Sequence, residues 1–565
     1  MSAPIEIATR VSDGRRKRGQ PKGRGVNEHA LARVSGLIDS PPRRDRLIEY
    51  LHKIQDSIGY LPSDEIVALA RLLKISPVEV YEVATFYHHF DVVKDNESPP
   101  APLTVRVCDS VSCEIAGANT LIESLQSALG KDVRVQRVPC VGRCDRAPVA
   151  TIHHRRIDDA DLDRVIEAAT NPESLPLVSD ESIRLDAYID AGGYELLQSI
   201  TRGESGVDKI LDELESSGLR GLGGAGFPAG RKWRIVRDFD APRLMAINID
   251  EGEPGTFKDR YYLERDPHRF IEGMLIAAHV VGIDQCYVYV RDEYPGVLAL
   301  LREEIDALAA TGRFDLPKIE LRRGAGAYIC GEESAMIESI EGKRGMPRLR
   351  PPYVAEVGLF GRPTLEHNCE TLFWVRDILQ QGDEAFAAHG RHGRTGLRSF
   401  SVSGRVKNPG VYLAPAGITL NELIDEYCGG MQDGHKLHAY FPGGASGGIL
   451  PASLANVPMD FDTLQEYGCF IGSAAVMVLS DQDRARDAAL NAMAFFAHES
   501  CGQCTPCRVG TIKAVDLMKH ETWDAGLLEE LCEVMADASI CGLGQAAPNP
   551  IRCIIKYFPD EVGVS

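Results

Sequence analysis

The chain has 565 residues, of which 44% are hydrophobic and 25% are charged, and its net charge is −20. This length exceeds what one hydrophobic core supports and predicts three or four domains, while the composition excludes collagen-like and wholly disordered proteins. The negative charge argues against non-specific nucleic-acid binding. Because no apolar run reaches the ~20 residues that span a bilayer and the N-terminus lacks a signal-peptide pattern, we expect a cytoplasmic protein.

Residues 1–35 are predicted to form a flexible basic arm, since the stretch 15–24 mixes Arg and Lys with Gly and Pro and offers no apolar face.

Residues 36–100 are predicted to form a helical bundle. Apolar residues recur there at helical spacing between positions 46 and 90, with breaks at 59–62 and 76–77. Strand and helix patterns then alternate over 101–175 and predict a compact α/β unit.

Two cysteine pairs lie at the loop ends of the strands predicted in this unit. Four residues separate Cys108 from Cys113, and three separate Cys140 from Cys144. Four thiolates on two loops can enclose either a [2Fe–2S] cluster or a tetrahedral Zn²⁺ ion. The wide first spacing favours the cluster, and zinc is the alternative. Fifteen cysteines in a cytosolic chain indicate metal binding more than disulfides, because thiols stay reduced there.

Three segments of this region carry a family resemblance: IQDSIGYLP at 54–62, VYEVATFYHHF at 80–90 and CVGRCDRAP at 140–148. On these segments, residues 45–170 resemble the small thioredoxin-like [2Fe–2S] subunit of respiratory complex I and its relatives. The resemblance includes all four cysteines and implies a thioredoxin-like [2Fe–2S] domain.

Residues 180–400 are predicted to form a Rossmann-like α/β domain, with strands at 244–249, 286–290 and 319–322 and helices at 270–279 and 296–308. The glycine-rich segment 217–233 (SGLRGLGGAGFPAGRKW) could admit a phosphate and a flat ring, with Lys232 neutralising charge. It does not match the usual dinucleotide fingerprint, so a mobile surface loop is the alternative. Segments 248–260 and 324–333 place acids beside glycines at strand ends, where open α/β sheets bind ligands. Those acids could also be solvated loop charges.

These three segments, together with PRLRPP at 347–352 and NCET at 368–371, closely resemble the NADH- and FMN-binding subunit of complex I. The FMN contacts that this resemblance implies are Gly221, Gly223, Lys232, Asn248, Asp250, Glu251, Tyr328, Gly331, Glu332, Asn368 and Thr371. It also implies that Phe227 stacks on the adenine side of NAD(H), that Glu253 meets the nicotinamide end, and that the same cleft is lined by Glu333, Arg350 and Tyr353. The sequence departs from the family pattern at Leu222, Arg350, His367 and Cys369.

Residues 401–485 are predicted to form a β-grasp module, which the same resemblance identifies as soluble-ligand-binding-like. Residues 486–565 are helical and carry Cys501, Cys504 and Cys507 at two-residue intervals, with Cys541 remote from them. This arrangement is typical of one [4Fe–4S] cluster, whereas zinc more often uses two separate pairs. The fold class expected for the whole chain is therefore multidomain α/β and α+β. The remaining cysteines are expected in cores: Cys286, Cys330, Cys369, Cys428, Cys469, Cys532 and Cys553.

The predicted activity is that of an NAD(H):acceptor diaphorase. NADH releases a hydride whereas clusters carry single electrons, so a flavin must stand between them, and no catalytic protein side chain is required. We expect the [4Fe–4S] cluster on the main path and the [2Fe–2S] cluster to one side.

No molybdopterin, nickel or quinone signature is present, so a partner must hold the electron source or sink. The order of the fused units resembles the beta subunit of NAD-dependent formate dehydrogenase and the diaphorase subunit of NAD-reducing hydrogenase. Residues 441–483 and SCGQCTPCRVGT resemble the former most. This implies a catalytic alpha subunit that carries molybdopterin-bound Mo or W and further iron–sulfur clusters and oxidises formate. The alternatives are the hydrogenase subunit, the NADH-oxidising module of complex I and, as a non-enzyme, a zinc-stabilised scaffold.

Overall fold

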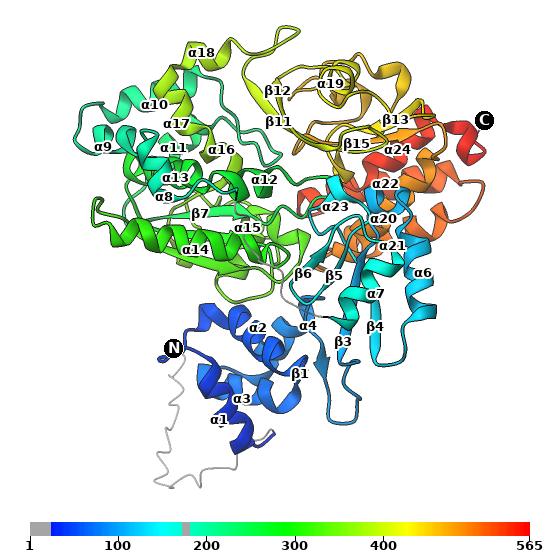
Figure 1. Ribbon diagram of the computed structural model, residues 1–565, viewed down its shortest axis with the longest axis horizontal. Helices are drawn as coiled ribbons and strands as arrows, with labels where there is room; N and C mark the ends of the chain where they lie inside the picture. The colour runs from blue at the N-terminus through cyan, green and yellow to red at the C-terminus, as the bar shows by residue number, and fades with distance from the viewer. Residues whose placement is uncertain (1–23, 172–180, 565) are drawn as a thin grey trace, which may run out of the picture.

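The computed structural model describes residues 24–171 and 181–564 (Figure 1). Its N-terminal part is a helical bundle with one small parallel strand pair, and the elements are α1 Glu28–Leu37, α2 Leu47–Ile58, β1 Leu61–Pro62, α3 Ser63–Leu73, α4 Pro77–Phe86 and β2 Val92–Val93. The α4 helix begins with a capping box between Ser76 and Glu79, which satisfies two backbone N–H groups.

The prediction of a flexible arm over residues 1–35 is wrong for its last residues, because α1 begins at Glu28. Residues 1–23 lie outside the described part of the chain. Asn27 caps α1 by accepting hydrogen bonds from the N–H groups of His29 and Ala30. Ala30 and Val34 are buried against the bundle, so a short apolar stripe overrides the polar composition around it.

The thioredoxin-like unit is a four-stranded sheet in the order β4-β3-β5-β6, with helices packed on it. Strands β3 and β4 are parallel, and β5 is antiparallel to β3 and to β6. The elements are β3 Leu103–Cys108, α5 Val111–Ile115, α6 Ala118–Ala128, β4 Val133–Val138, β5 Ala150–Ile152, β6 Arg155–Ile157 and α7 Leu162–Thr170. Val105 and Val107 bury one face of β3, while Thr104 and Arg106 occupy the other.

The central domain is built on a fully parallel sheet in the order β10-β7-β8-β9. The strands are β7 Arg243–Ile249, β8 Ile283–Val290, β9 Lys318–Arg323 and β10 Thr364–Asn368. The helices are α8 Leu185–Asp190, α9 Glu195–Thr201, α10 Val207–Ser216, α11 Ala229–Arg237, α12 Lys258–Arg265, α13 Pro267–Val281, α14 Pro295–Ala310, α15 Glu333–Ile340, α16 Cys369–Phe373, α17 Val375–Gln381 and α18 Asp383–Ala387. Strand β10 was not predicted, because its sequence TLEHN lacks an apolar run.

The last two units follow the predicted order. The β-grasp module is a mixed five-stranded sheet with one helix: β11 Leu397–Gly404, β12 Gly410–Pro415, α19 Leu420–Glu426, β13 Leu437–Phe441, β14 Leu450–Pro451 and β15 Ala475–Ser480. The C-terminal unit is helical: α20 Ala485–Glu499, α21 Thr505–Met518, α22 Ala525–Ala538, α23 Gly542–Ala546 and α24 Pro548–Tyr557.

One apolar core runs without a break through the bundle, the central domain, the β-grasp module and the C-terminal helices, whereas the thioredoxin-like unit has mainly its own core. In Figure 1 this unit lies between the N-terminal bundle and the C-terminal helices. The architecture is the multidomain α/β and α+β class that the sequence predicts. Within the described ranges, no helix combines the length and apolar character needed to cross a membrane.

Candidate active site and cluster sites

Residues from four distant segments meet at the carboxyl edge of the central sheet. Strands β7 and β10 end side by side, with Asn248 paired in register to Asn368. The Asn248 side chain donates to the Gly331 carbonyl at 2.9 Å. The Leu222 N–H of the glycine-rich loop donates to Thr371 Oγ1 at 2.9 Å. The predicted FMN segments therefore converge at the edge where parallel sheets bind ligands.

Two glycines of these loops lie so close to neighbouring residues that a side chain would fit tightly there. A Cβ atom at Gly223 would lie 3.0 Å from Asn368 Cβ, and one at Gly252 would lie 3.2 Å from Tyr328 Cα. These glycines let the loops pack against neighbouring backbone and keep peptide groups accessible to a ligand.

Asp250 is the one predicted contact with an unsatisfied buried atom. The residue is 2% exposed, and its Oδ2 atom has no hydrogen-bond partner among the described residues. Burial raises the pKa of this carboxyl well above its usual range. An orphaned acceptor of this kind in a ligand cleft indicates a bound molecule with hydroxyl or N–H donors.

The Glu251 carboxylate is held by the protein itself. It accepts hydrogen bonds from the N–H groups of Asp259 at 2.7 Å and Arg260 at 3.2 Å, and from the Tyr294 hydroxyl at 2.9 Å. Burial, reinforced by Asp259, raises the pKa of Glu251 to about 7. Its side chain therefore fixes the start of α12, which differs from the direct ligand contact that the resemblance implies.

Glu253 connects the central domain to the β-grasp module. Its Oε1 atom accepts hydrogen bonds from Ser446 N at 2.8 Å and Ser446 Oγ at 2.7 Å, and the Tyr328 hydroxyl donates to Oε2. Burial raises the pKa of Glu253. Sequence reasoning missed Ser446, because nothing in the local sequence relates it to a residue 193 positions away.

Charged side chains predicted for NAD(H) pair with one another at the start of α15. Glu332 caps α15 by accepting the N–H groups of Ser334 and Ala335. Arg350 pairs with Glu332 and lies 3.0 Å from Glu333.

Two aromatic side chains predicted for NAD(H) are exposed, Phe227 by 41% and Tyr353 by 59%, and the Arg231 guanidinium lies over the Phe227 ring, 5.8 Å from its centroid.

Lys232 donates to the carbonyl of Glu366 at 2.9 Å and lies 3.2 Å from its carboxylate. Sequence reasoning missed Glu366 because it missed strand β10.

A fully buried ion network lies behind the sheet edge, and the sequence analysis assigned no role to it. There Lys258 pairs with Asp259 at 2.9 Å and Glu370 at 3.0 Å, and Asp259 accepts a hydrogen bond from Asn368.

The first cysteine set converges as predicted in space. Cys108 ends β3, Cys113 lies in α5, and Cys140 and Cys144 lie on the loop after β4, with their sulfurs 3.3 Å apart. All four are buried, and contact with the thiols of Cys113 and Cys140 raises the pKa of Cys108. The central domain holds this loop, because Arg291 donates to the Cys140 carbonyl at 2.6 Å.

The second set encloses a small cavity. Cys501, Cys504, Cys507 and Cys541 line it together with Ile329 of the central domain. Cys504 and Cys541 precede the first turns of α21 and α23, and burial raises the pKa of Cys541 to about 12.

Both cysteine sets adjoin the cleft. Cys140, Asp250 and Tyr328 line one small cavity, and the next residue, Ile329, lines the four-cysteine cavity. The loop after β9 therefore lies between the cleft and both cysteine sites.

Comparison with known proteins agrees with this geometry. Family models match as a thioredoxin-like [2Fe–2S] ferredoxin over 36–171, the Nuo51 FMN-binding domain over 214–377, an SLBB domain over 399–450 and the NADH-ubiquinone oxidoreductase-F iron–sulfur binding region over 487–564. The NADH-quinone oxidoreductase F 2 subunit of Rhizobium meliloti (strain 1021) is 41% identical over 392 residues, which are 67% of this chain and 93% of the relative.

The chain belongs to the family of NADH-quinone oxidoreductase F subunits. The F subunit of Aquifex aeolicus (strain VF5) is also 41% identical, over 67% of this chain and 90% of its own. A solved NAD⁺-reducing [NiFe]-hydrogenase in the H₂-reduced state matches 92% of this chain and 93% of its own, with 33% identity and a TM-score of 0.81.

The cofactors of this chain are FMN, one [2Fe–2S] cluster and one [4Fe–4S] cluster, which confirms the prediction. The residues fit them. The orphaned Asp250 oxygen suits the hydroxyl donors of a flavin's ribityl chain, and each set of four converging cysteines has the number and type of ligands that one cluster needs. The protein is an oxidoreductase that transfers electrons between NAD(H) and iron–sulfur clusters through FMN.

Proposed function

We propose that this chain is the NAD(H)-reacting diaphorase subunit of a multisubunit oxidoreductase. The observation that carries the proposal is the loop after β9, which contributes Tyr328 to the Glu253 cluster and Ile329 to the cavity of the four cysteines. Short separation between a flavin site and a cluster site suits electron transfer. Bound FMN supplies the exchange between a hydride and single electrons.

Within this proposal, Gly221, Gly223, Asn248, Gly331, Asn368 and Thr371 form the backbone cradle of FMN, and Asp250 accepts from it. Glu251 and Glu332 position the surrounding helices, which is supported by their bonds to the first turns of α12 and α15. Lys232 and Tyr328 complete the FMN site.

For NAD(H), we assign Phe227 and Tyr353 as stacking surfaces, because both rings are exposed. Arg350 would meet a phosphate after exchanging its pairing with Glu332 and Glu333. Glu253, held by Ser446, orients the nicotinamide end, and orientation accounts for much of the rate of such transfers.

For the clusters, we assign Cys108, Cys113, Cys140 and Cys144 to the [2Fe–2S] cluster and Cys501, Cys504, Cys507 and Cys541 to the [4Fe–4S] cluster.

A one-electron dye reduced by NADH tests the activity of the isolated chain. The proposal predicts turnover that disappears when FMN is removed and returns when FMN is added. Turnover independent of FMN would contradict it.

Two kinds of partner subunit could supply or accept the electrons of this chain. A partner of the [NiFe]-hydrogenase type is supported by the end-to-end match to the NAD⁺-reducing hydrogenase chain, which includes the N-terminal bundle and thioredoxin-like unit. A formate-oxidising partner with Mo or W is the second candidate and is supported by the sequence of residues 441–483. The F subunits of NADH-quinone oxidoreductase match only 67% of the chain.

Metal analysis of the complex purified with its native partners decides between them. Nickel in stoichiometric amount supports the hydrogenase type, and molybdenum or tungsten supports the formate type. Absence of all three metals would reject both candidates and leave a complex-I-like assembly.

A further inference from the structure

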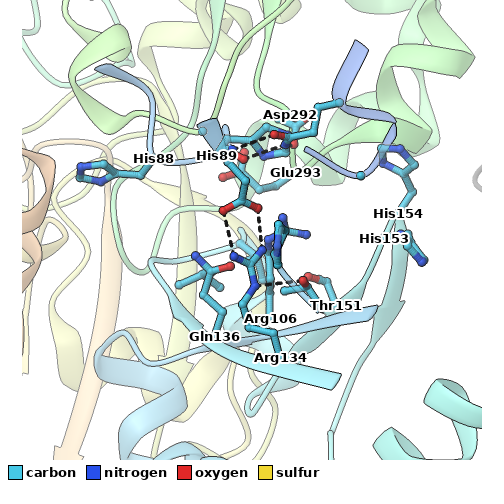
Figure 2. Close-up of a pocket in the computed structure, with 18 of the residues that line it drawn as sticks. His88, His89, Arg106, Arg134, Gln136, Thr151, His153, His154, Asp292 and Glu293 are labelled. Atoms are coloured by element: carbon cyan, nitrogen blue, oxygen red, sulfur yellow. Dashed lines mark hydrogen bonds and ion pairs between the residues drawn. The ribbon is translucent and has the colours of Figure 1, made fainter. Parts of the chain in front are cut away.

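A large cavity lies away from the cleft, between the helical bundle, the thioredoxin-like sheet and the loop after β8. Its volume is about 830 Å³. Figure 2 shows His89 and Asp292 on one wall, facing Arg106 and Arg134 of the sheet. The proposed electron path uses none of these side chains.

Three potential metal ligands from separate elements meet at this wall: His52 of α2, His89 after α4 and Asp292 after β8. One ligand atom from each lies within 4.8 Å of the others. His89 Nδ1 is 3.1 Å from Asp292 Oδ2, and His52 Nδ1 is 3.9 Å from Asp292 Oδ1. Ligands of a tetrahedral Zn²⁺ ion are about 3.3 Å apart, as its bond lengths of about 2.0–2.1 Å require. A small closing movement would bring the three atoms to this geometry.

The tautomer of His52 leaves a bare lone pair in this group. Its Nε2 atom lies 2.7 Å from the Gly324 carbonyl, which can only accept, so Nε2 carries the hydrogen. His52 is 1% exposed, and its Nδ1 atom is buried without a hydrogen-bond partner among the described residues. An imidazole lone pair and a carboxylate oxygen therefore lie close together with no hydrogen between them.

The surrounding charges are compatible with a cation. Arg323 donates to Asp292 Oδ1 at 2.7 Å and pairs with Asp56 at 2.7 Å on its other side. Metal-binding carboxylates are commonly hydrogen-bonded in this way, and metal-binding histidines commonly donate their second N–H to a carbonyl, as His52 does. Asp292, Asp56 and Arg323 together carry one net negative charge. Arg106 and Arg134 face them across the cavity, and Arg134 pairs with Asp91 at 2.6 Å.

We propose that His52, His89 and Asp292 bind one divalent transition-metal ion of the Zn²⁺ class and thereby fasten the helical bundle to the central domain. Two imidazoles and one carboxylate form a donor set that Zn²⁺ favours, with a fourth position left for water. The ion enters through the cavity, because His89 and Asp292 line it (Figure 2). The site is separate from both cysteine sets.

The test is equilibrium dialysis of the full chain against micromolar Zn²⁺ after chelator treatment, with bound zinc and iron counted together. The variants are His89→Gln and Asp292→Asn, which spare the deeply buried His52. The matched control is His88→Gln, because His88 is the adjacent imidazole but packs on His498 instead, with ring centroids 4.3 Å apart. Equal iron in all samples ensures that cysteine-bound zinc cannot explain a difference.

We expect the wild type and His88→Gln to bind one Zn²⁺ more than His89→Gln and Asp292→Asn, and Zn²⁺ to raise Tm only in the first pair. Equal zinc in the wild type and His89→Gln would overturn the proposal. So would a loss in His88→Gln as large as in His89→Gln, because binding would then not depend on the three residues.

Discussion

At the scale of single residues, Asp250 is the most informative of the predicted FMN contacts, because one of its carboxyl oxygens is buried and has no hydrogen-bond partner among the described residues. Replacing it by Asn should weaken FMN binding by about tenfold, since a lost hydrogen bond to a buried acceptor costs about 1–2 kcal/mol. The measurement is flavin fluorescence released from chain equilibrated with limiting FMN. The exposed Asp315→Asn on the same domain is the control, and unchanged FMN affinity in Asp250→Asn would refute the assignment.

The cysteines are proposed to have two roles, as cluster ligands or as core residues, and the iron content of variants distinguishes them. One [4Fe–4S] and one [2Fe–2S] cluster require about six irons per chain. Cys504→Ser should lower this to about two, whereas Cys532→Ala should keep all six, because Cys532 is buried in α22 and outside both sets. Iron counted on anaerobically purified chain checks this. An undiminished count in Cys504→Ser would exclude that residue as a ligand.

At the scale of elements, Glu251 makes the stability of the α12 region depend on pH. The folded chain keeps the Glu251 proton up to about pH 7, whereas an unfolded chain releases it near pH 4.5. The folded state therefore binds more protons in this window, and the Glu251 contribution to the free energy of unfolding falls as pH rises from about 4.5 to about 7.

Glu251→Gln should remove that contribution, so the difference in Tm between variant and wild type should change across the window. Thermal unfolding at several pH values measures this. A difference in Tm that is constant with pH would contradict the buried environment of the carboxyl.

The junction between the central domain and the β-grasp module depends on Ser446. Ser446→Ala leaves Glu253 Oε1 with one donor where it had two. We expect KM for NADH to rise several-fold while FMN content stays unchanged, because Glu253 would lose orientation and not its charge. Steady-state kinetics measures this against the exposed Ser453→Ala control. If Ser446→Ala lost FMN while KM for NADH stayed unchanged, the assignment of Glu253 to the nicotinamide end would be contradicted.

The sequence was informative wherever spacing along the chain determines chemistry. The three cysteines near 504 and the glycines near 223 could be predicted because their neighbours in space are also neighbours in sequence. Strand β10 could not, because TLEHN has no strand periodicity, and Glu366 was missed with it. Contacts such as Glu253 with Ser446 and Arg291 with the Cys140 carbonyl depend on how domains dock, which local patterns do not encode.

At the scale of the whole molecule, the way the domains share their apolar cores is consistent with the proposed electron path. The bundle, central domain, β-grasp module and C-terminal helices share one core, which holds the cleft and the four-cysteine cavity in fixed relation. The thioredoxin-like unit has mainly its own core and attaches through loops, as at Arg291 and the Cys140 carbonyl. This agrees with a [2Fe–2S] cluster to one side of the main path.

In the proposed function, one chain converts between NAD(H) and single electrons. A visible absorption spectrum of anaerobically purified chain, recorded before and after NADH with iron counted on the same sample, tests it most directly. We expect flavin and cluster bands that bleach with NADH and about six irons per chain. A colourless sample that contains zinc in the cysteine sites and does not respond to NADH would contradict it and indicate a scaffold.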